Sequence, residues 1–399
     1  KDESTGESFH QHPIFVAATR QHVGKTTVSL AIMSGLKKRF DKVGFLKPVG
    51  QQHVPVYSED LQKTIQVDKD CCLVLERFGL KHVDYKDMSP VIIPRGYTKQ
   101  YIDGEISHDD QLDRVLAAMD HVTEASDIVL CEGTGHCAVG SIVGVNNARV
   151  ANLMGAEMIL IANGGLGSAF DELELNRVLC EHNNVSIAGV IINKVLPEKY
   201  DQTKHYMSKA IEDRWGVPLL GCIPDRPFLG CPALVDLEKL FESELISGHK
   251  FRLRHYTAED TNIVTTSLTR FLVNLRKKPS RTLYICHVTR DDLILGFLGE
   301  CQRRKRNDNE DDLEAALLIC GRKGKYQLSS EMKNMMEGIP EAPMMVIEKS
   351  TQQVMTAINR FTPKLNINDS NRVGVAVEHY EPYIDFDMLL ERTRTPIES

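Results

Sequence analysis

The stretch from Ile14 to Ile32, IFVAATRQHVGKTTVSLAI, constrains what this chain can fold into more than any other feature. A short run of apolar residues leads into a loop that ends in Gly24, Lys25 and Thr26, and a helix with an apolar face is predicted to start there. Backbone N–H groups at such a loop face an anion, lysine adds a positive charge, and a threonine hydroxyl can ligate Mg²⁺. The stretch therefore predicts a buried strand, a phosphate-binding loop and a helix.

The loop departs from the usual phosphate-loop pattern G-x-x-x-x-G-K-[ST] at one position, where Thr19 replaces the first glycine. The tripeptide GKT is common by chance, and its alternative interpretation is an ordinary turn between a strand and a helix. The flanking strand and helix favour phosphate binding. We therefore predict that Lys25 has a catalytic role and that the cofactor-binding residues of the loop are Val23, Gly24, Lys25, Thr26 and Thr27.

The first two-thirds of the chain alternates short β-branched runs with longer amphipathic stretches, which is the pattern of a parallel sheet covered by helices. The runs are apolar throughout, as strands buried on both faces are. The predicted strands are residues 14–17, 43–47, 128–131, 158–162, 187–192 and 219–223. The predicted helices are residues 25–39, 69–79, 109–124, 171–182 and 199–215.

A second, smaller α/β unit is predicted after a stretch rich in Pro and Gly at 223–232. Its predicted strands are 283–287, 316–319 and 344–347, and its predicted helices are 291–303, 329–337 and 351–361. We therefore expect a disordered N-terminal segment at 1–12, a nucleotide-binding domain at 13–235 and a second domain at 236–399.

Two charged residues follow predicted strands of the first domain, where ligands of open α/β sheets collect. Lys47 ends the second strand in GFLKPVGQ, and we predict a catalytic role beside the phosphates; the alternative is an ordinary surface lysine. Glu132 directly follows a buried strand in IVLCEGTGH and is predicted to hold Mg²⁺; the alternative is a carboxylate that caps a turn or helix. His136 is interpreted as a loop histidine without a catalytic role.

The composition excludes several classes of protein. The chain has 48 Lys and Arg residues against 55 Asp and Glu, a net charge of −7, which argues against binding to nucleic acid or anionic membranes. No apolar run approaches the ~20 residues of a membrane helix. The ten cysteines contain no CxxC pair, so free thiols in a reducing compartment are expected. Because the chain starts at Lys1, we expect that an upstream segment, with any targeting signal, has been removed.

Five motifs occur in a fixed order, VGKT, KPVG, EGTG, IANGGLGS and GVIINK. Over Ile14–Leu240 the chain therefore resembles the dethiobiotin synthetase-type branch of P-loop ATPases, which includes the cobyrinic acid diamide synthases. The resemblance implies a P-loop NTPase-type parallel sheet with ATP and Mg²⁺ as cofactors. It also implies that Asn193 contacts adenine and that Lys47 is a second lysine for phosphate or substrate. Magnesium would be held by Thr26, Glu132 and Asp70, with Asp68 as the alternative to Asp70.

The remainder, with CHVTRDDLILGFLGECQ and MMVIEKSTQQVMTAINRFTPKLNINDSNRV, resembles a DRTGG-type domain. In bacterial relatives this domain completes the N-terminal regulatory half of long phosphate acetyltransferases, and two-domain versions occur alone. The residues from Thr289 to Asp292 stand where that family has its characteristic turn, which puts ligand binding by this domain in doubt. Since the chain ends at Ser399, the catalytic acetyltransferase domain is expected to be missing.

Three functions are compatible with these resemblances. The first is a nucleotide-dependent regulatory or scaffolding module, with a protein partner bound through the second domain. The second is an ATP-dependent ligase, although KPVGQQH and EGTGH depart from that family's substrate segments. The third is a structural subunit that has lost its nucleotide. The relatives imply a homodimer in the cytoplasm or, after processing, in the chloroplast stroma or mitochondrial matrix.

Overall fold

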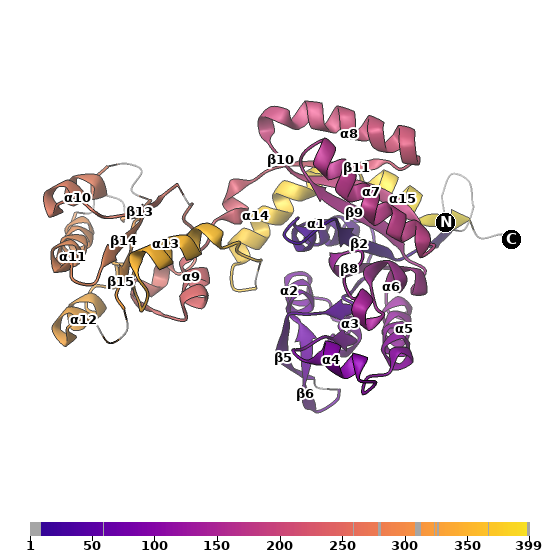
Figure 1. The fold of residues 1–399 in the computed structure, drawn as a ribbon, viewed down its shortest axis with the longest axis horizontal. Helices are drawn as coiled ribbons and strands as arrows, with labels where there is room; N and C mark the ends of the chain where they lie inside the picture. The colour runs from indigo at the N-terminus through magenta and orange to yellow at the C-terminus, as the bar shows by residue number, and fades with distance from the viewer. Residues whose placement is uncertain are drawn as a thin grey trace. The chain divides into compact units, whose positions relative to one another are not determined.

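The computed structural model divides the chain into two compact units (Figure 1). Unit 1 comprises Lys1–Arg226 and Leu365–Ser399, and unit 2 comprises Pro227–Lys364. The residues that the structure describes are 9–58, 60–257, 259–277, 281–307, 313–322, 324, 327–365 and 367–396. This division differs from the expected domains 13–235 and 236–399, because the end of the chain packs with the first unit.

Unit 1 is built on a six-stranded sheet in which every paired neighbour is parallel. Its order is β11-β10-β9-β2-β8-β3, so β2, which leads into the phosphate loop, lies inside the sheet between β9 and β8. The strands are β2 (Ile14–Ala18), β3 (Val43–Leu46), β8 (Ile128–His136), β9 (Glu157–Asn163), β10 (Ile187–Val195) and β11 (Leu219–Pro224). The predicted α/β class is confirmed. All carboxyl ends of these strands meet at one edge, which positions the site.

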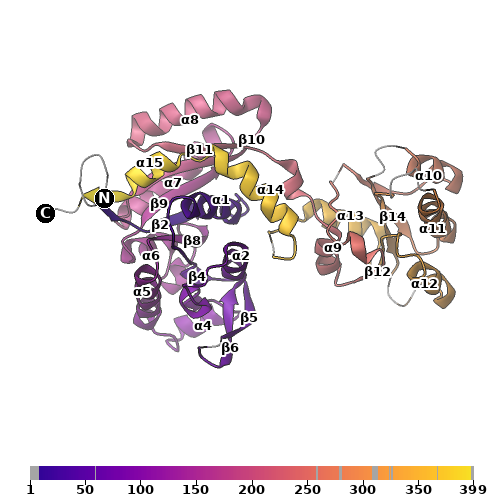
Figure 2. The ribbon, with the colours of Figure 1, turned by 180° about the vertical axis from the view of Figure 1, so that it is seen from behind.

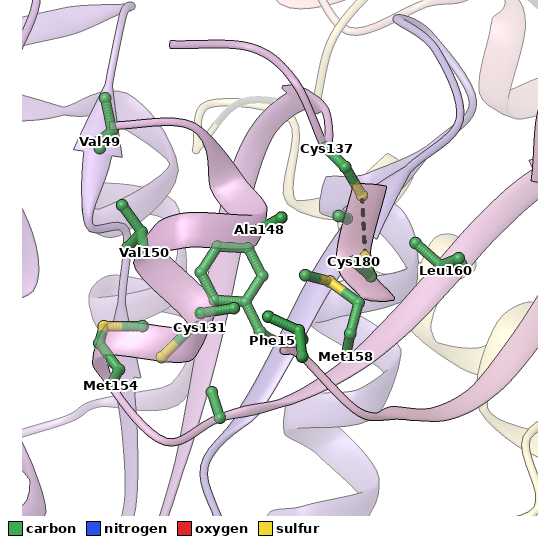
Figure 3. Close-up of a cluster of buried hydrophobic side chains, with 14 of the residues drawn as sticks. Phe15, Val49, Cys131, Cys137, Ala148, Val150, Met154, Met158, Leu160 and Cys180 are labelled. Carbon is green, nitrogen blue, oxygen red and sulfur yellow. Dashed lines mark hydrogen bonds between the residues drawn. The ribbon is translucent and has the colours of Figure 1, made fainter. Parts of the chain in front are cut away.

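The helices of unit 1 flank this sheet (Figure 1). The longer ones are α1 (Lys25–Lys37), α2 (Lys69–Phe78), α5 (His108–Glu124), α6 (Asn147–Leu153), α7 (Gly167–His182) and α8 (Tyr200–Trp215), and the shorter ones are α3 (Tyr85–Met88) and α4 (Tyr97–Ile102). Apolar side chains from β2, β9 and α6 interlock in the core, among them Phe15, Met158 and Ala148 (Figure 3). Beside them, the buried sulfur atoms of Cys137 and Cys180 lie 3.8 Å apart. Within the described residues, none of the helices has the length and apolarity needed to cross a bilayer.

The segment between β3 and α2 departs from the predicted pattern. Between β3 and α2 the chain forms a short strand β4 (Val49–Gly50), which pairs with β7 (Val91–Ile92), and a hairpin of β5 (His53–Ser58) and β6 (Lys63–Asp68). The hairpin was not predicted, because β5 is largely exposed and lacks the apolar run of a buried strand. It delivers the chain to α2, whose N-cap is Asp68.

The C-terminal part of unit 1 returns along the first helix. It consists of α14 (Ser370–Tyr380), α15 (Phe386–Arg392) and β17 (Arg394–Pro396), and α14 lies beside α1 (Figure 2). Strand β17 pairs antiparallel with β1 (Phe9–Gln11). The expected disorder at 1–12 is therefore wrong for residues 9–11, because these residues form a strand that pairs with β17. Residues 1–8 lie outside the described part of the chain.

Unit 2 has a smaller, mixed sheet of order β12-β16-β15-β14-β13, with β12 antiparallel to its neighbour. Its strands are β12 (Leu245–Ser247), β13 (Thr261–Ile263), β14 (Leu283–His287), β15 (Ala316–Cys320) and β16 (Met344–Ile347). Its helices are α9 (Leu234–Phe241), α10 (Leu268–Leu275), α11 (Asp291–Lys305), α12 (Ser330–Glu337) and α13 (Thr351–Arg360). The two edge strands, β12 and β13, were not predicted, because a strand of three residues is too short to show an apolar pattern.

Candidate functional site

The phosphate loop connects β2 to α1, and Gly24 makes its geometry possible. Gly24 has φ of 103°, a left-handed conformation that strongly favours glycine. A Cβ atom at this position would lie 2.5 Å from Nδ2 of Asn193, which leaves no room for a larger residue. Helix α1 then begins at Lys25, and Thr26 and Thr27 lie half-buried in its first turn. The loop therefore brings the backbone N–H groups of the α1 N-terminus to the carboxyl edge of the sheet.

Thr19, which replaces the first glycine of the motif, ties the loop to the sheet and to α7. Its backbone N–H donates to the carbonyl of Ile161 at 2.9 Å, and its hydroxyl donates to Glu172 at 2.9 Å. The Arg20 guanidinium lies 3.6 Å from the same carboxylate. The hydroxyl that this substitution introduces thus adds one anchoring contact at the start of the loop.

Two residues near the end of β10 hold the phosphate loop through hydrogen bonds to its carbonyl groups. Asn193, predicted to contact adenine, is fully buried, and its Nδ2 donates to the carbonyl of Val23 at 2.8 Å. Lys194, which the sequence analysis missed, donates from Nζ to the carbonyl of His22 at 2.8 Å. His22 and Lys194 have φ of 62° and 55°, a costly conformation for non-glycine residues that occurs at functional sites. The position of Lys194 directly after Asn193 is the only sequence signal for its role.

Lys47, just after β3, is buried among three carboxylates. Its ammonium forms an ion pair with Asp70 and lies 3.1 Å from Oε1 of Glu132 and 3.7 Å from Oδ1 of Asp68. Asp68 also caps α2, because its Oδ1 accepts from the backbone N–H of Asp70 at 3.0 Å. The surface-lysine alternative for Lys47 does not match this placement, since the residue is only 5% exposed.

Glu132 lies inside β8, opposite Val16 of β2, and not directly after the strand as expected. The strand is longer than predicted because its pairing with β2 continues to His136. Oε1 of Glu132 accepts from the Thr26 hydroxyl at 3.0 Å as well as from Lys47. Among the described residues, its buried Oε2 has no hydrogen-bond partner. A buried carboxylate oxygen without a partner is costly, which marks a place for a cation or water.

The site combines three carboxylates (Asp68, Asp70 and Glu132) with two ammonium groups (Lys25 and Lys47), which leaves one net negative charge when all are ionised. Burial raises the pKa of Glu132 and of Asp68 above their ordinary values. Burial alone would lower the pKa of Lys47, but the carboxylates around it outweigh burial and hold that pKa well above its ordinary value. Burial lowers the pKa of Lys25.

Among the described residues, no group of three or more His, Cys, Asp or Glu side chains is placed to hold a metal ion by itself, so a divalent cation here would also need other oxygen ligands. Carboxylate and hydroxyl oxygens are the ligands that Mg²⁺ prefers. Asp70 and Glu132 both contact the Lys47 ammonium, and Glu132 also accepts from the Thr26 hydroxyl. The orphaned Oε2 of Glu132 gives the same set an unused ligand. Within the described part of the chain, Lys25 makes no hydrogen bond or ion pair, although it lies near enough to Glu132 and Asp70 to interact with their charges.

The predicted DRTGG-like turn of unit 2 is held by an internal ion pair. Arg290 donates to both oxygens of Asp292 at 2.8 Å, and its Nη2 also donates to the carbonyl of Thr266 at 3.0 Å. His287 hydrogen-bonds to the Thr289 hydroxyl at 2.8 Å. The polar groups of this turn therefore satisfy one another.

A family model described as an AAA domain (AAA_26) matches residues 12–233. The chain is 24% identical over 387 residues to a phosphate acetyltransferase of Synechocystis sp. and 24% identical over 406 residues to one of Pseudomonas aeruginosa. These alignments cover 96% and 97% of this chain but 52% and 53% of the relatives. The chain thus spans about half the length of the curated relatives it matches.

Among solved structures, similarity is found to the MinD cell division protein of Aquifex aeolicus, with a TM-score of 0.33 and 17% identity over 55% of this chain and 84% of that chain. A ParA family ATPase from Chlorobium tepidum has a TM-score of 0.31 and 17% identity over 54% of this chain and 85% of that chain.

Proposed function

The chain belongs to the AAA domain family, and from this premise we propose that unit 1 binds ATP with Mg²⁺ and serves as a nucleotide-dependent regulatory or scaffolding module. The observation that carries the proposal is the convergence of the phosphate loop, an uncommitted Lys25 and the Lys47–carboxylate cluster around the unpartnered Oε2 of Glu132. A net negative cluster beside a positively polarised helix terminus suits a metal–phosphate pair.

In this proposal each group has one task. The N–H groups of the α1 N-terminus and the Lys25 ammonium bind the phosphates, while Thr26, Asp70 and Glu132 hold the cation. Bound Mg²⁺ would neutralise charge on the phosphates and the carboxylates. Lys47 stays protonated because its carboxylate neighbours keep its pKa well above the ordinary value. Asn193 and Lys194 keep the loop in shape through the carbonyls that they bind.

A binding role is favoured over an ATP-dependent ligase of the dethiobiotin synthetase type. Lys47, the lysine that a ligase of that type would use on phosphate or substrate, is engaged by three carboxylates. The segment that follows Lys47 is also engaged in hydrogen bonds, since the backbone N–H groups of Gln51 and Gln52 donate to Asp68 at 3.2 and 3.3 Å. The two relatives named above, which the chain matches over nearly all its length, are phosphate acetyltransferases.

The proposal extends to assembly and location. By analogy with its relatives, the chain forms a homodimer, and unit 2, the DRTGG-like part, contacts a protein partner. Ten free cysteines, nine of them buried, favour a reducing compartment, either the cytoplasm or an organelle.

Turnover separates the regulatory module from the ligase. We expect radiolabelled ATP to bind saturably in equilibrium dialysis with Mg²⁺, while phosphate release by the full chain stays at the rate of a Lys25→Ala variant. Sustained phosphate release above that variant, increased by a diamine carboxylate such as diaminopelargonate, would establish the ligase instead. Absence of binding at millimolar nucleotide would leave only the structural-subunit alternative.

A further inference from the structure

Residues 367–396 of unit 1, which we name the C-terminal return, pack against the helix that begins at the phosphate loop (Figure 2). We propose that Glu381 of this return is a positioning residue for helix α1, and that docking of the return and binding of nucleotide favour each other. Nucleotide affinity then depends on a segment that follows unit 2 in the chain. This inference rests on the proposed function, and it adds to the site a regulatory element outside residues 12–233, which the family model matches.

A single carboxylate makes two contacts that hold the return to α1. The Ser34 hydroxyl donates to Oε2 of Glu381 at 2.7 Å, and the Lys38 ammonium forms an ion pair with Oε1. Ser34 lies in the last turn of α1, and Lys38, four positions later on the same face, is the C-cap residue of the helix. The Glu381 side chain is only 16% exposed, so solvent screens this ion pair less than an ordinary surface pair. Glu381 therefore fixes the C-terminal end of the phosphate-binding helix.

An aromatic ring adds a further contact at a glycine inside α1. The Phe386 ring packs so closely on Gly35 that a Cβ there would lie 2.0 Å from it. The Arg39 guanidinium lies 4.5 Å from the centre of the same ring, and its Nη1 donates to the Gly35 carbonyl at 3.1 Å. A glycine inside a helix is destabilising relative to alanine. Because Gly35 admits the ring, the sequence of α1 itself is fitted to the docked return.

The return is also fixed to β11, the strand at one end of the sheet order. Nε2 of His379 donates to the carbonyl of Pro224 at 2.8 Å, which requires the tautomer protonated at Nε2. Slightly later, the backbone N–H of Asp385 donates to the carbonyl of Leu220 at 2.8 Å. Strands β10 and β9 lie between β11 and β2, the strand that leads into the phosphate loop. The return thus joins the far edge of the sheet to the helix that follows β2.

Helix α1 connects the return to the nucleotide. Its first turn carries Lys25 and Thr26, which the proposed function assigns to phosphate and cation, and its last turn carries the contact to Glu381. A continuous helix of 13 residues moves as one body, so a ligand that fixes one end leaves less freedom for the return to remove at the other. Coupling of this kind is reciprocal. The docked return therefore raises nucleotide affinity by the same factor by which bound nucleotide favours docking.

The order of the chain allows unit 2 to act on this coupling. Unit 2 is inserted between Arg226 and Leu365, so its first connection starts two residues after Pro224 and its second leads into α14. The His379–Pro224 hydrogen bond joins these two connections on the unit 1 side. A change of state in unit 2 that pulls on either connection therefore acts on the docking of the return and, through α1, on the nucleotide.

Mg-ADP affinity tests the proposal, measured by calorimetry on full-length variants at a temperature at which each is folded. Glu381→Ala removes both contacts with α1 and is expected to weaken binding about five-fold, the lower end of the range for coupled sites. Glu381→Gln keeps an acceptor for the Ser34 hydroxyl and should bind more tightly than Glu381→Ala. In a Ser34→Ala/Lys38→Met background, Glu381→Ala is expected to have no further effect, because its partners are already absent. Glu378→Ala, exposed on α14, is the matched control and should bind as the wild type.

Each result decides a different point. A lowered Tm with wild-type affinity in Glu381→Ala, or an equal loss of affinity with and without Ser34 and Lys38, gives the return a merely structural role and overturns the proposal. If the wild type binds no Mg-ADP, the proposed function fails and this inference fails with it. Binding that Lys25→Ala abolishes and Glu381→Ala leaves unchanged refutes this inference alone.

A second measurement applies if Glu381→Ala does not fold, and it uses hydrogen exchange on the wild type. Because bound nucleotide favours docking of the return, Mg-ADP should slow exchange in α14 more than in α8, which the return does not hold to α1. An equal change in the two helices, or no change in α14, contradicts the proposal.

Discussion

Replacing Lys47 by Met isolates the electrostatic balance of the site. The substitution keeps a long apolar side chain but removes the ammonium that lies among Asp68, Asp70 and Glu132. Three carboxylates then share a buried region with Lys25 as the nearest cation, and the net charge of the cluster goes from −1 to −2. We expect the variant to be strongly destabilised without metal and to gain more from Mg²⁺ than the wild type does.

The magnitude follows from the burial of the ion pairs. Removing one partner of a buried ion pair costs about 3–5 kcal/mol of folding free energy. For a domain of this size, each kcal/mol lowers the Tm by about 2–4 °C, so the expected loss is about 6–20 °C. A cation that binds only the folded state, at about one hundred times its Kd, returns about 2.7 kcal/mol. Mg²⁺ should therefore restore about half or more of the loss.

The single tryptophan, Trp215, makes the assay specific, because it lies in α8 of unit 1 and its fluorescence reports the unfolding of that unit. Thermal unfolding is followed in EDTA and in MgCl₂ for the wild type, for Lys47→Met and for Lys209→Met, whose lysine is exposed on α8. The control should match the wild type in both buffers. An unchanged Tm of Lys47→Met in EDTA, or an equal response to Mg²⁺ in all three proteins, would refute the reasoning.

Three further substitutions test other parts of the structure. Gly35→Ala should lower stability by about 1–2 kcal/mol although alanine favours helices, because its Cβ would meet the Phe386 ring, and Phe386→Leu should recover most of the loss in urea unfolding. Glu300→Gln should destabilise unit 2 by about 3 kcal/mol, because it leaves three arginines around a buried neutral side chain. Urea unfolding followed by circular dichroism measures this loss, and a loss under about 1 kcal/mol would contradict the prediction. The hydrogen bond to Asp87 raises the pKa of His121, so this contact stabilises the fold fully below about pH 6.5 and ceases to do so as the pH rises through the raised pKa. His121→Asn should therefore lower the Tm at about pH 5.5 and leave it unchanged at about pH 9.

Local sequence signals predicted most of the sheet and its helices. The buried strands are apolar on both faces, and helix starts such as Lys25 and Lys69 carry clear loop or capping residues before them. The course of the chain after residue 365 could not be predicted in this way. An amphipathic pattern shows that α14 has a buried face, but it does not identify α1 as the surface that covers it.

The same limit applies to the site. Lys25, Lys47 and Glu132 could be predicted because each lies in the loop or directly after an apolar run of the sequence, and a parallel sheet brings such places to one edge. Lys194 acts through a partner distant in the chain, the His22 carbonyl. Contacts of that kind depend on the fold and leave no spacing in the sequence to detect.

Calorimetric titration of Mg-ATP and Mg-ADP into the full chain and its Lys25→Ala variant tests the central claim most directly. Lys25 is the cation of the phosphate loop and makes no hydrogen bond or ion pair among the described residues, so its removal should weaken binding at least about a hundred-fold, since charged contacts to phosphate are strong. Saturable binding by the wild type that this substitution abolishes is the predicted result. Equal affinities for the two proteins, or no heat of binding from either at millimolar nucleotide, would contradict the assignment of this loop as a nucleotide site.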